Sequence, residues 1–401
     1  MAEVVAEQAE RGRLIVVGTG IRSIAQLTQE AVAWIKAADI VCYALADPVT
    51  QRWVRDNAKA AEDLGVYYDE SANRLTSYDR MAARLVAHAR AGRTVVGAFY
   101  GHPGIFTDPS HQAVAIARSE GIEARMLPGI SAEDCLFADL GVDPGLGASE
   151  SYEATEMLVR GRRPDTTSHV VIWQIGVLAQ QGFSSSRGAS DLQPLVDYLL
   201  SSYPADHLVT HYQGSQLVLC ESLVEPVALG DLGGIRAAVT STLYVPPLTD
   251  AGFRADMAAS LGLDGTVGPG ARWEVGQPFT GEAPVDPGHQ EPDWYQPLAP
   301  GRSRVQDLIV ALAEDPELLA AFEADPGPYV GALGLDPIEI FAVLTRNAGL
   351  ISLCVRCGTG TAAAVAGGMA ATEAEAASFR VAADGRLMRP RRVGAAPRRN
   401  S

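Results

Sequence analysis

The stretch Val95-Val96-Gly97-Ala98-Phe99-Tyr100-Gly101-His102-Pro103-Gly104-Ile105-Phe106 decides the fold of this chain. Its first residues form a short apolar run, which is typical of a strand buried on both faces of a sheet. The run ends in Gly-His-Pro-Gly, where two glycines allow close backbone approach and the proline fixes one dihedral angle. Such a strand, with helical patterns on both sides, predicts the ligand-binding edge of an open α/β sheet. A tight turn without a ligand is the alternative that this stretch alone leaves open.

The residues before this stretch predict a parallel sheet. Residues 14–17 have the pattern of a strand, residues 24–38 that of a helix and residues 40–43 that of a second strand, which together make a β-α-β unit. The loop Gly18-Thr19-Gly20 lacks the third glycine of a dinucleotide-binding fingerprint, so it predicts a tight turn under a helix.

The residues after the stretch predict a second ligand-binding turn and a second half. A strand at 124–127 ends in Pro-Gly, and Ser131 can cap the next helix with acidic residues in its first turn. Further strands are expected at 170–174, 208–212 and 238–245, with a helix at 192–201.

Composition excludes several classes of partner. The chain has 401 residues, of which 47% are hydrophobic and 20% are charged, so it is long enough for a sizeable core. Its net charge of −16 argues against nucleic acid and anionic membranes as partners. No run is long enough to span a membrane, and the acidic N-terminus lacks an apolar signal segment. Five scattered cysteines suit a reducing compartment, so we expect a cytoplasmic protein.

The C-terminal part differs from the rest. Residues 246–300 are rich in proline and have no helical period, which predicts an extended arm. Helices are expected from Ser303, Pro316 and Asp336-Pro337, followed by a short strand at 350–355. The final segment is rich in alanine and glycine and then in arginine, so we expect a flexible tail.

Tyr68, Arg74 and Tyr78 are the candidates for proton chemistry. Their spacing around a loop and a helix start allows two phenols and a guanidinium to converge. A phenol beside an arginine loses its proton more easily, because the opposite charge favours the phenolate, and it can then act as a base. An ordinary polar loop is the alternative.

Two further motifs resemble metal or redox sites but lack the required context. His207 and His211 have the spacing of helical metal ligands, yet the residues between them favour a strand. Cys354-Val-Arg-Cys357 is placed at the end of the expected strand rather than opening a helix, and no second pair of cysteines accompanies it. We therefore expect no metal.

The motifs in order resemble a known family. The resemblance covers residues 13–356. The chain resembles the tetrapyrrole-methylase-like (class III) S-adenosylmethionine enzymes and, more narrowly, the borosin peptide-backbone α-N-methyltransferases of the fused precursor type. The resemblance is carried by Gly18-Thr19-Gly20, Tyr100-Gly101-His102-Pro103-Gly104, Leu127-Pro128-Gly129-Ile130-Ser131-Ala132-Glu133-Asp134, Ile172-Trp173-Gln174, Ser241-Thr242-Leu243-Tyr244-Val245-Pro246-Pro247, Asp315-Pro316, Phe322, Asp325-Pro326 and Gly334-Leu335.

The resemblance implies an α/β fold of two lobes, with S-adenosylmethionine bound between them. It implies a methyltransferase domain at 13–247, an arm at 248–302, a helical clasp that binds the precursor at 303–356 and a tail at 357–401. The clasp would interlock two protomers into a homodimer. Tyr68, Arg74 and Tyr78 match the family's catalytic set. The residues expected near the cofactor are Tyr100, His102, Ile105, Ser131, Ala132, Gln174, Ser215, Ser241 and Thr242.

In fused members of this family the substrate is the enzyme's own C-terminal tail. Here the position of residues 380–389 matches such a core peptide, but their composition is less apolar than in the fungal members. Val381, Ala382 and Ala383 are the first candidates for methylation, whereas Pro390 has no N–H and is excluded. The alternatives are a separate precursor peptide as substrate, a small-molecule methyltransferase of the tetrapyrrole type, and a binding protein that has lost catalysis.

Overall fold

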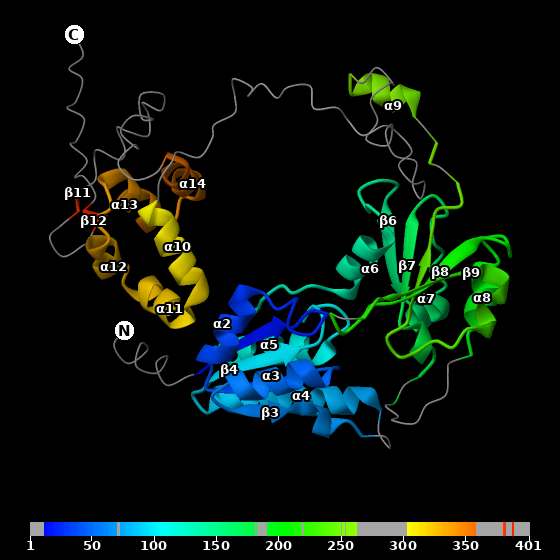
Figure 1. Ribbon diagram of the computed structural model, residues 1–401, viewed down its shortest axis with the longest axis horizontal. Helices are drawn as coiled ribbons and strands as arrows, with labels where there is room; N and C mark the ends of the chain where they lie inside the picture. The colour runs from blue at the N-terminus through cyan, green and yellow to red at the C-terminus, as the bar shows by residue number, and fades with distance from the viewer. Residues whose placement is uncertain are drawn as a thin grey trace, which may run out of the picture. The chain divides into compact units, whose positions relative to one another are not determined.

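The computed structural model describes residues 12–69, 73–180, 182, 191–218, 220–249, 251–252, 254–262, 303–357, 380–381 and 387–388. The chain divides into two compact units, Met1–Glu282 and Ala283–Ser401. The first unit contains two α/β lobes, and the second is mainly helical (Figure 1).

The first lobe is built on a parallel sheet with the strand order β3-β2-β4-β1-β5. The central strand β4 is the apolar run of the decisive stretch, and it pairs with β1 and β2 on its two sides. The strands are β1 (Arg13–Gly18), β2 (Ile40–Ala44), β3 (Ala61–Asp63), β4 (Thr94–Phe99) and β5 (Glu123–Met126). The predicted parallel sheet is therefore confirmed.

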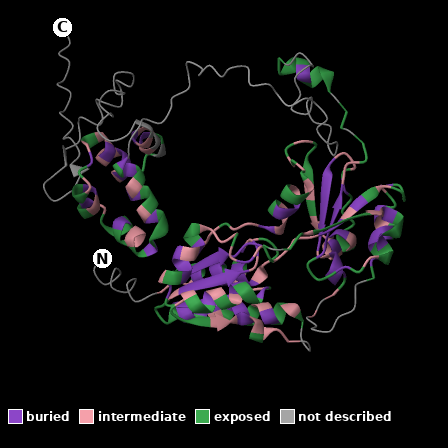
Figure 2. Ribbon diagram, in the orientation of Figure 1, coloured by how far each residue is buried: buried purple, intermediate pink, exposed green. Residues whose placement is uncertain are grey.

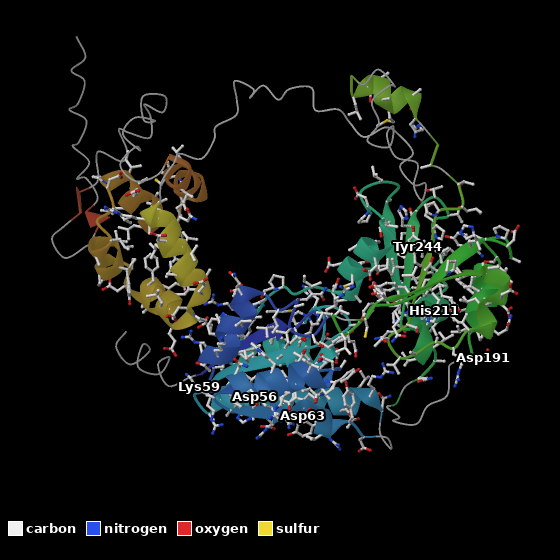
Figure 3. All side chains as sticks on the ribbon, in the orientation of Figure 1. Asp56, Lys59, Asp63, Asp191, His211 and Tyr244 are labelled. Carbon is white, nitrogen blue, oxygen red and sulfur yellow. The ribbon has the colours of Figure 1, made fainter. Side chains whose placement is uncertain are left out.

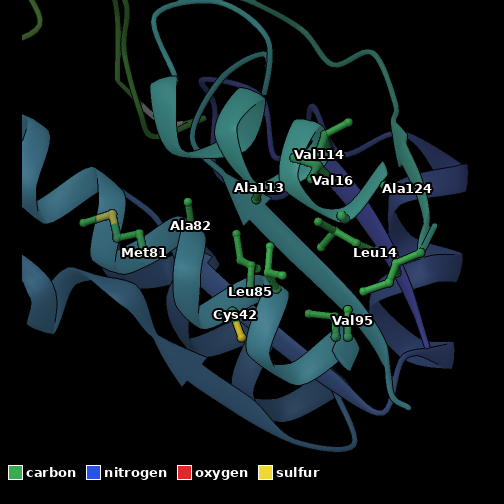
Figure 4. Packing of buried hydrophobic residues seen from close by; sticks show 14 of the residues in the cluster. Leu14, Val16, Cys42, Met81, Ala82, Leu85, Val95, Ala113, Val114 and Ala124 are labelled. Carbon is green, nitrogen blue, oxygen red and sulfur yellow. The ribbon is translucent and has the colours of Figure 1, made fainter. Parts of the chain in front are cut away.

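Helices cover both faces of this sheet, as expected for strands that carry apolar side chains on both faces. Alternate residues of β1 point to opposite sides: Leu14 and Val16 join the core under α4 (Arg74–Arg90) and α5 (Asp108–Ser119), shown in Figure 4. Ile15 and Val17 join the other core, under α2 (Gln29–Ala37) and α3 (Pro48–Asn57). The burial pattern in Figure 2 follows this layering, with buried strands and half-exposed helices.

The second lobe has a mixed sheet with the order β6-β7-β10-β8-β9. Only β6 and β7 run parallel; the other neighbours are antiparallel. The strands are β6 (Ser149–Glu153), β7 (His169–Trp173), β8 (Leu208–Gln213), β9 (Leu223–Ala228) and β10 (Thr242–Val245). The edge strands β6 and β9 were not predicted, because β6 is polar in sequence and β9 contains Pro226 and is exposed over its first four residues.

Helices flank this second sheet on both faces too. Helix α6 (Ala132–Leu140) packs Leu136 against Val171 and Tyr244, whereas α7 (Ala154–Arg160) and α8 (Gln193–Leu199) pack against the opposite face. The residues of this unit that the structure describes also include three short 3₁₀ helices: η1 (Leu64–Tyr67), η2 (Ile175–Val177) and η3 (Leu229–Gly234). A short helix, α9 (Ala255–Ser260), lies in the segment expected to be an extended arm, most of which is outside the described residues.

In the described part of the second unit, five helices form a bundle with its own apolar core. They are α10 (Arg304–Glu314), α11 (Pro316–Ala324), α12 (Gly327–Ala332), α13 (Pro337–Leu344) and α14 (Ala348–Cys357). The strand predicted at 350–355 is wrong: these residues form α14, because Leu350 and Cys354 are four apart on one helix face and both are buried in this core. Consequently Cys354 and Cys357 lie on a helix and not after a strand.

In the tail, Arg380–Val381 (β11) and Leu387–Met388 (β12) pair as a short antiparallel ladder. Ala382 and Ala383, two of the candidate modified residues, lie outside the described residues. Within the described ranges, no helix combines the length and apolar character needed to cross a membrane.

Candidate active site

A cavity of about 800 Å³ lies in the first unit and is lined by residues from both lobes. The carboxyl ends of the first sheet's strands lead into it, as expected for an open α/β sheet. Ten of the twelve residues predicted for catalysis or cofactor binding lie on its wall, so the structure brings them together. They are Tyr68, Arg74, Tyr78, Tyr100, His102, Ile105, Ser131, Ala132, Gln174 and Thr242.

Glycines bring three turns together at one end of the cavity. Gly20 and Gly101 form a backbone bridge, and both have a φ of +72°, which disfavours any residue with a side chain. A Cβ at Gly18 would lie 2.2 Å from the carbonyl oxygen of Gly101, and one at Gly129 would lie 3.0 Å from the Cα of Gly18. The Gly18-Thr19-Gly20 loop is thus a tight turn packed on its neighbours, as predicted.

Arg74 and Tyr78 lie on the same face of α4, one turn apart. The helix begins at Arg74, and the side chain of Asn73 caps it by accepting a hydrogen bond from the N–H of Leu75. This start gives Arg74 and Tyr78 the (i, i+4) spacing that lets side chains meet. The guanidinium of Arg74 is hydrogen-bonded to the Tyr78 phenol and donates to the carbonyl oxygen of Gln180 at 3.1 Å.

Tyr68 completes this group from the end of η1. Its ring is edge-on to that of Tyr78, with centroids 6.4 Å apart and an interplanar angle of 74°. Asp63 holds the turn that delivers Tyr68, because its carboxylate accepts the N–H of Gly65 at 2.8 Å. The structure therefore brings together the two phenols and the guanidinium that the sequence singled out.

Burial dominates the acidity of both phenols. It raises the pKa of Tyr68 to about 12, with a further contribution from Tyr78, and the charge of Arg74 only partly opposes this effect. Burial also raises the pKa of Tyr78, again against the lowering effect of Arg74. Arg74 thus favours the phenolate of both tyrosines, but in the free protein desolvation outweighs this charge interaction.

The turns that carry the other predicted residues are held by local hydrogen bonds. His102 Nδ1 accepts the N–H of Gly104 at 2.9 Å, which closes the Gly-His-Pro-Gly turn. Ser131 and Asp134 form a capping box at the start of α6, so the predicted helix cap is confirmed. The Tyr100 phenol is hydrogen-bonded to the side chain of Gln216 in the second lobe.

Ser215 and Ser241 are not among the residues that line the cavity, although Gly214 and Thr242 beside them are. The Ser215 hydroxyl donates to the carbonyl oxygen of Leu217 at 3.0 Å. Ser241 is fully buried and its hydroxyl contacts His211. A cofactor contact for these two serines stays a prediction.

Sequence reasoning missed an aromatic pair on the cavity wall. Phe106 follows β4 in the first lobe and Trp173 ends β7 in the second; their ring centroids are 5.9 Å apart. Phe106 and Gln174 both have a positive φ, of 52° and 60°, which is rare for residues with side chains and tends to occur at functional sites. The available signal was the place of both residues at the end of an apolar strand, where ligand-binding residues are expected.

One possible set of metal ligands exists within the described part of the chain, outside the cavity. Cys42, Glu62 and His88 place their ligand atoms within 4.8 Å of one another. Arg84 already binds both oxygens of Glu62, at 2.6 and 2.8 Å, so a cation would have to displace it. His211 lies on β8, as predicted, and His207 immediately precedes that strand.

Comparisons with known proteins identify the family. The model of the tetrapyrrole (corrin/porphyrin) methylases matches residues 13–184. A methyltransferase/ribosomally synthesized type I borosin cyclic peptide precursor from Mycena rosella is 38% identical over 365 residues, which is 86% of this chain and 90% of the relative. The chain belongs to the borosin methyltransferase/precursor family. Another member, the omphalotin A precursor from Omphalotus olearius, is 37% identical over 342 residues, 79% of this chain and 81% of the relative.

Comparison with solved structures finds more distant similarity. The uroporphyrin-III-C-methyltransferase from Thermus thermophilus aligns with a TM-score of 0.44 and 21% identity, over 63% of this borosin family member and 96% of the other chain. The predicted tetrapyrrole-methylase-like fold of two α/β lobes is confirmed, as is the resemblance on which it was based.

Proposed function

We propose that this protein transfers methyl groups from S-adenosylmethionine to backbone amide nitrogens of a peptide, and that the peptide is its own C-terminal tail. The observation that carries the proposal is the convergence of Tyr68, Arg74 and Tyr78 in a cavity shared by both lobes. The names of the relatives, which combine a methyltransferase with a cyclic peptide precursor in one chain, support the same activity.

The residues on the cavity wall fit the proposed methyl donor. Gly101 and Gly214 leave an opening in the wall because they have no side chain; a Cβ at Gly214 would lie 3.2 Å from the Tyr212 hydroxyl, and one at Gly101 would lie 3.4 Å from Ile21. Polar groups surround this opening from both lobes, with Tyr100 and His102 on one side and Gln174 and Thr242 on the other. These residues would hold S-adenosylmethionine, which supplies a transferable methyl group and a positively charged sulfur when bound.

The Tyr-Arg-Tyr group supplies what an amide needs to react. The nitrogen lone pair of a peptide bond is delocalised into the carbonyl group, so the nitrogen is a poor nucleophile until its proton is removed. The phenolate oxygen of Tyr68 or Tyr78 takes the N–H proton of the substrate. Arg74 stabilises the negative oxygen of the resulting imidate, in the manner of an oxyanion-hole donor.

The protonation state of the phenols couples this step to the charge in the cavity. Both phenols hold their protons in the free protein, because burial raises their pKa. A cation bound in the same cavity favours the phenolate and lowers these pKa values. A bound methyl donor would thus increase the fraction of phenolate at a given pH. An alternative small-molecule substrate would not require this base, since most ring carbons and oxygens are better nucleophiles than an amide.

We propose that the functional unit is a homodimer interlocked through the helical unit, in the cytoplasm. Helix α10 exposes Ile309 and Val310 side by side, at 42% and 45%, which favours a covering partner. The acidic net charge argues against nucleic acid and anionic membranes as further partners.

Mass spectrometry of the full-length protein tests the proposed function. The protein is expressed with ample S-adenosylmethionine, its intact mass is measured and its tail is fragmented. A ladder of methylene masses on backbone nitrogens of residues 380–389 is the expected result. An unmodified tail in a protein that binds the methyl donor would instead indicate a separate precursor peptide. Methyl groups only on carbon or side-chain atoms would refute backbone methylation.

A further inference from the structure

Glu225, His211 and Ser241 form a hydrogen-bonded row in the second lobe that the proposed chemistry does not use. His211 Nδ1 lies 3.0 Å from Glu225 Oε2, and His211 Nε2 lies 2.8 Å from Ser241 Oγ. The strand register explains the row. On β8, His211 is directly opposite Glu225 of β9 and Leu243 of β10, so Ser241 is its diagonal neighbour on the same face. Figure 3 shows His211 among these strands.

The row has the order of a nucleophilic triad but cannot act as one. The serine of a triad must reach the carbon that it attacks. Ser241 is fully buried, His211 is 2% exposed, and the Ser241 hydroxyl accepts the backbone N–H of Ala238 at 2.8 Å. Its function must therefore be found in what the row holds in place.

The proton positions follow from the chemistry of the partners. A backbone N–H only donates, and an ionised carboxylate only accepts. With a neutral imidazole, His211 Nδ1–H donates to Glu225, Nε2 accepts the Ser241 hydroxyl, and Ser241 Oγ accepts the N–H of Ala238. Every donor in the row is used once, and the row ends on the backbone of residue 238.

That backbone belongs to a turn on the cavity wall. Val239, Thr240 and Thr242 line the cavity, and the N–H of Ser241 donates to the carbonyl oxygen of Ala238 at 2.9 Å. On another side the turn packs on Gly176, where a Cβ would lie only 1.8 Å from the Ala238 oxygen. The turn is thus fixed by backbone packing and by the row.

We propose that His211 is a positioning residue which, through Ser241, holds the turn 238–242 against the methyl donor and so sets the affinity for S-adenosylmethionine. This inference rests on the proposed function. Ser241 then supports the donor site through the backbone that it anchors. This role explains why its hydroxyl contacts His211 and not the cavity, although Ser241 is next to the cavity wall in the sequence. Thr242 and the main chain of the turn remain as the contacting groups.

Binding of S-adenosylhomocysteine to the full-length protein, measured by calorimetry, tests the proposal without turnover. Asparagine at position 211 replaces only the Nδ1 side of the imidazole, whereas glutamine reaches the Nε2 position and can keep the Ser241 contact. We expect His211→Asn to raise the Kd about tenfold, as for loss of a buried hydrogen bond. His211→Gln should raise it less than about threefold, with kcat at saturating S-adenosylmethionine within about twofold for both.

His169 provides a matched control. It is fully buried in the same lobe and also contacts two partners, the Tyr244 hydroxyl at 2.6 Å and the Leu146 carbonyl oxygen at 3.0 Å, neither of which lies on the cavity wall. His169→Asn should lower the melting temperature and leave the Kd unchanged. A folded His211→Asn protein that binds as tightly as the wild type would overturn the proposal, as would an equal loss of affinity in His169→Asn.

Glu225 keeps the proposal testable if the His211 variants fail to fold, because its side chain is 51% exposed. Glu225→Leu removes the acceptor of Nδ1–H, whereas Glu225→Gln keeps an oxygen there, so the Leu variant should bind about threefold more weakly than the Gln variant. Equal affinities would overturn the positioning role. A wild-type protein that binds no S-adenosylhomocysteine would overturn the proposed function, and this inference with it.

Discussion

Gly20 and Gly101 exchange two backbone hydrogen bonds, with N···O distances of 3.3 and 2.9 Å. Thr19 and Phe99, which precede them in the sequence, are also hydrogen-bonded, although 80 positions separate them. Both glycines have a left-handed backbone, so each turn can approach the other without a side chain between them. The cavity wall at Gly101 is consequently main chain, and its shape there depends on the absence of a Cβ.

Gly18→Ala should destabilise the first lobe by about 1–3 kcal/mol, as an overpacked core does. Its Cβ would lie 2.2 Å from the Gly101 oxygen, and the neighbour is backbone that cannot move aside. Chemical denaturation measures the change. Gly234→Ala is the control, since a Cβ there meets nothing within 4 Å, and it should change stability by less than about 0.5 kcal/mol. Equal stabilities of the two variants would contradict the packing described here.

Tyr78→Phe should reduce methyl transfer by about 10²–10⁴-fold and leave methyl-donor binding unchanged, because only the proton acceptor is removed. Single-turnover mass spectrometry and calorimetry measure the two effects. Tyr68→Phe, assayed in parallel, identifies which phenol takes the proton: the larger loss marks the base. Tyr198→Phe, which removes a phenol bonded to the Arg162 oxygen away from the site, serves as the control. Full activity in both Tyr68→Phe and Tyr78→Phe would refute the assignment.

Arg74→Lys should lower the rate of methyl transfer by about 10²–10³-fold, because an ammonium group cannot contact the Tyr78 phenol, the Gln180 oxygen and the imidate oxygen together. Arg80→Lys is the matched control on the same helix, where the guanidinium forms an exposed ion pair with Asp69 at 3.6 Å. A rate unchanged in Arg74→Lys would exclude it as the oxyanion stabiliser.

The rate of methyl transfer should rise with pH across the neutral range. Burial raises the pKa of Tyr68 to about 12, so only a small fraction is phenolate near neutrality in the free protein. Because the phenolate is the active form, its fraction and the rate should increase about tenfold per pH unit while the pH is below the pKa. Single-turnover rates from pH 6 to pH 9, roughly, measure the slope. A flat profile would show that the rate does not depend on the ionisation of a phenol in this pH range, which would contradict the prediction.

Ile309→Lys should weaken the proposed homodimer by about tenfold or more, since a charge would replace a half-exposed apolar side chain in the interface. Analytical ultracentrifugation measures the dissociation constant. Glu314→Gln on the same helix is the control and should leave assembly unchanged. An Ile309→Lys dimer as tight as the wild type would place the interface elsewhere.

Sequence patterns predicted the parts of this fold that local chemistry decides. The apolar run at Val95 and Val96 predicts a strand buried on both faces, and Ser131 before two acidic residues predicts a helix start; both are confirmed. Sequence patterns failed where contacts between residues distant in the sequence decide the structure. Nothing local shows that Leu350 and Cys354 share a helical core, or that burial outweighs Arg74 at the phenols. The role of His211 was equally hidden, because it depends on strand partners distant in the sequence.

Trp173 gives the cavity an optical reporter of its own. Its indole N–H donates to Ser151 Oγ at 2.5 Å, its ring meets Phe106, and it lies beside Gln174 on the cavity wall. Indole emission responds to the polarity and motion of its surroundings, so occupancy of the cavity should change the intrinsic fluorescence of the unlabelled protein. Trp173→Phe would remove that signal and leave the emission of the other tryptophans, so ligand arrival could be timed separately from methyl transfer.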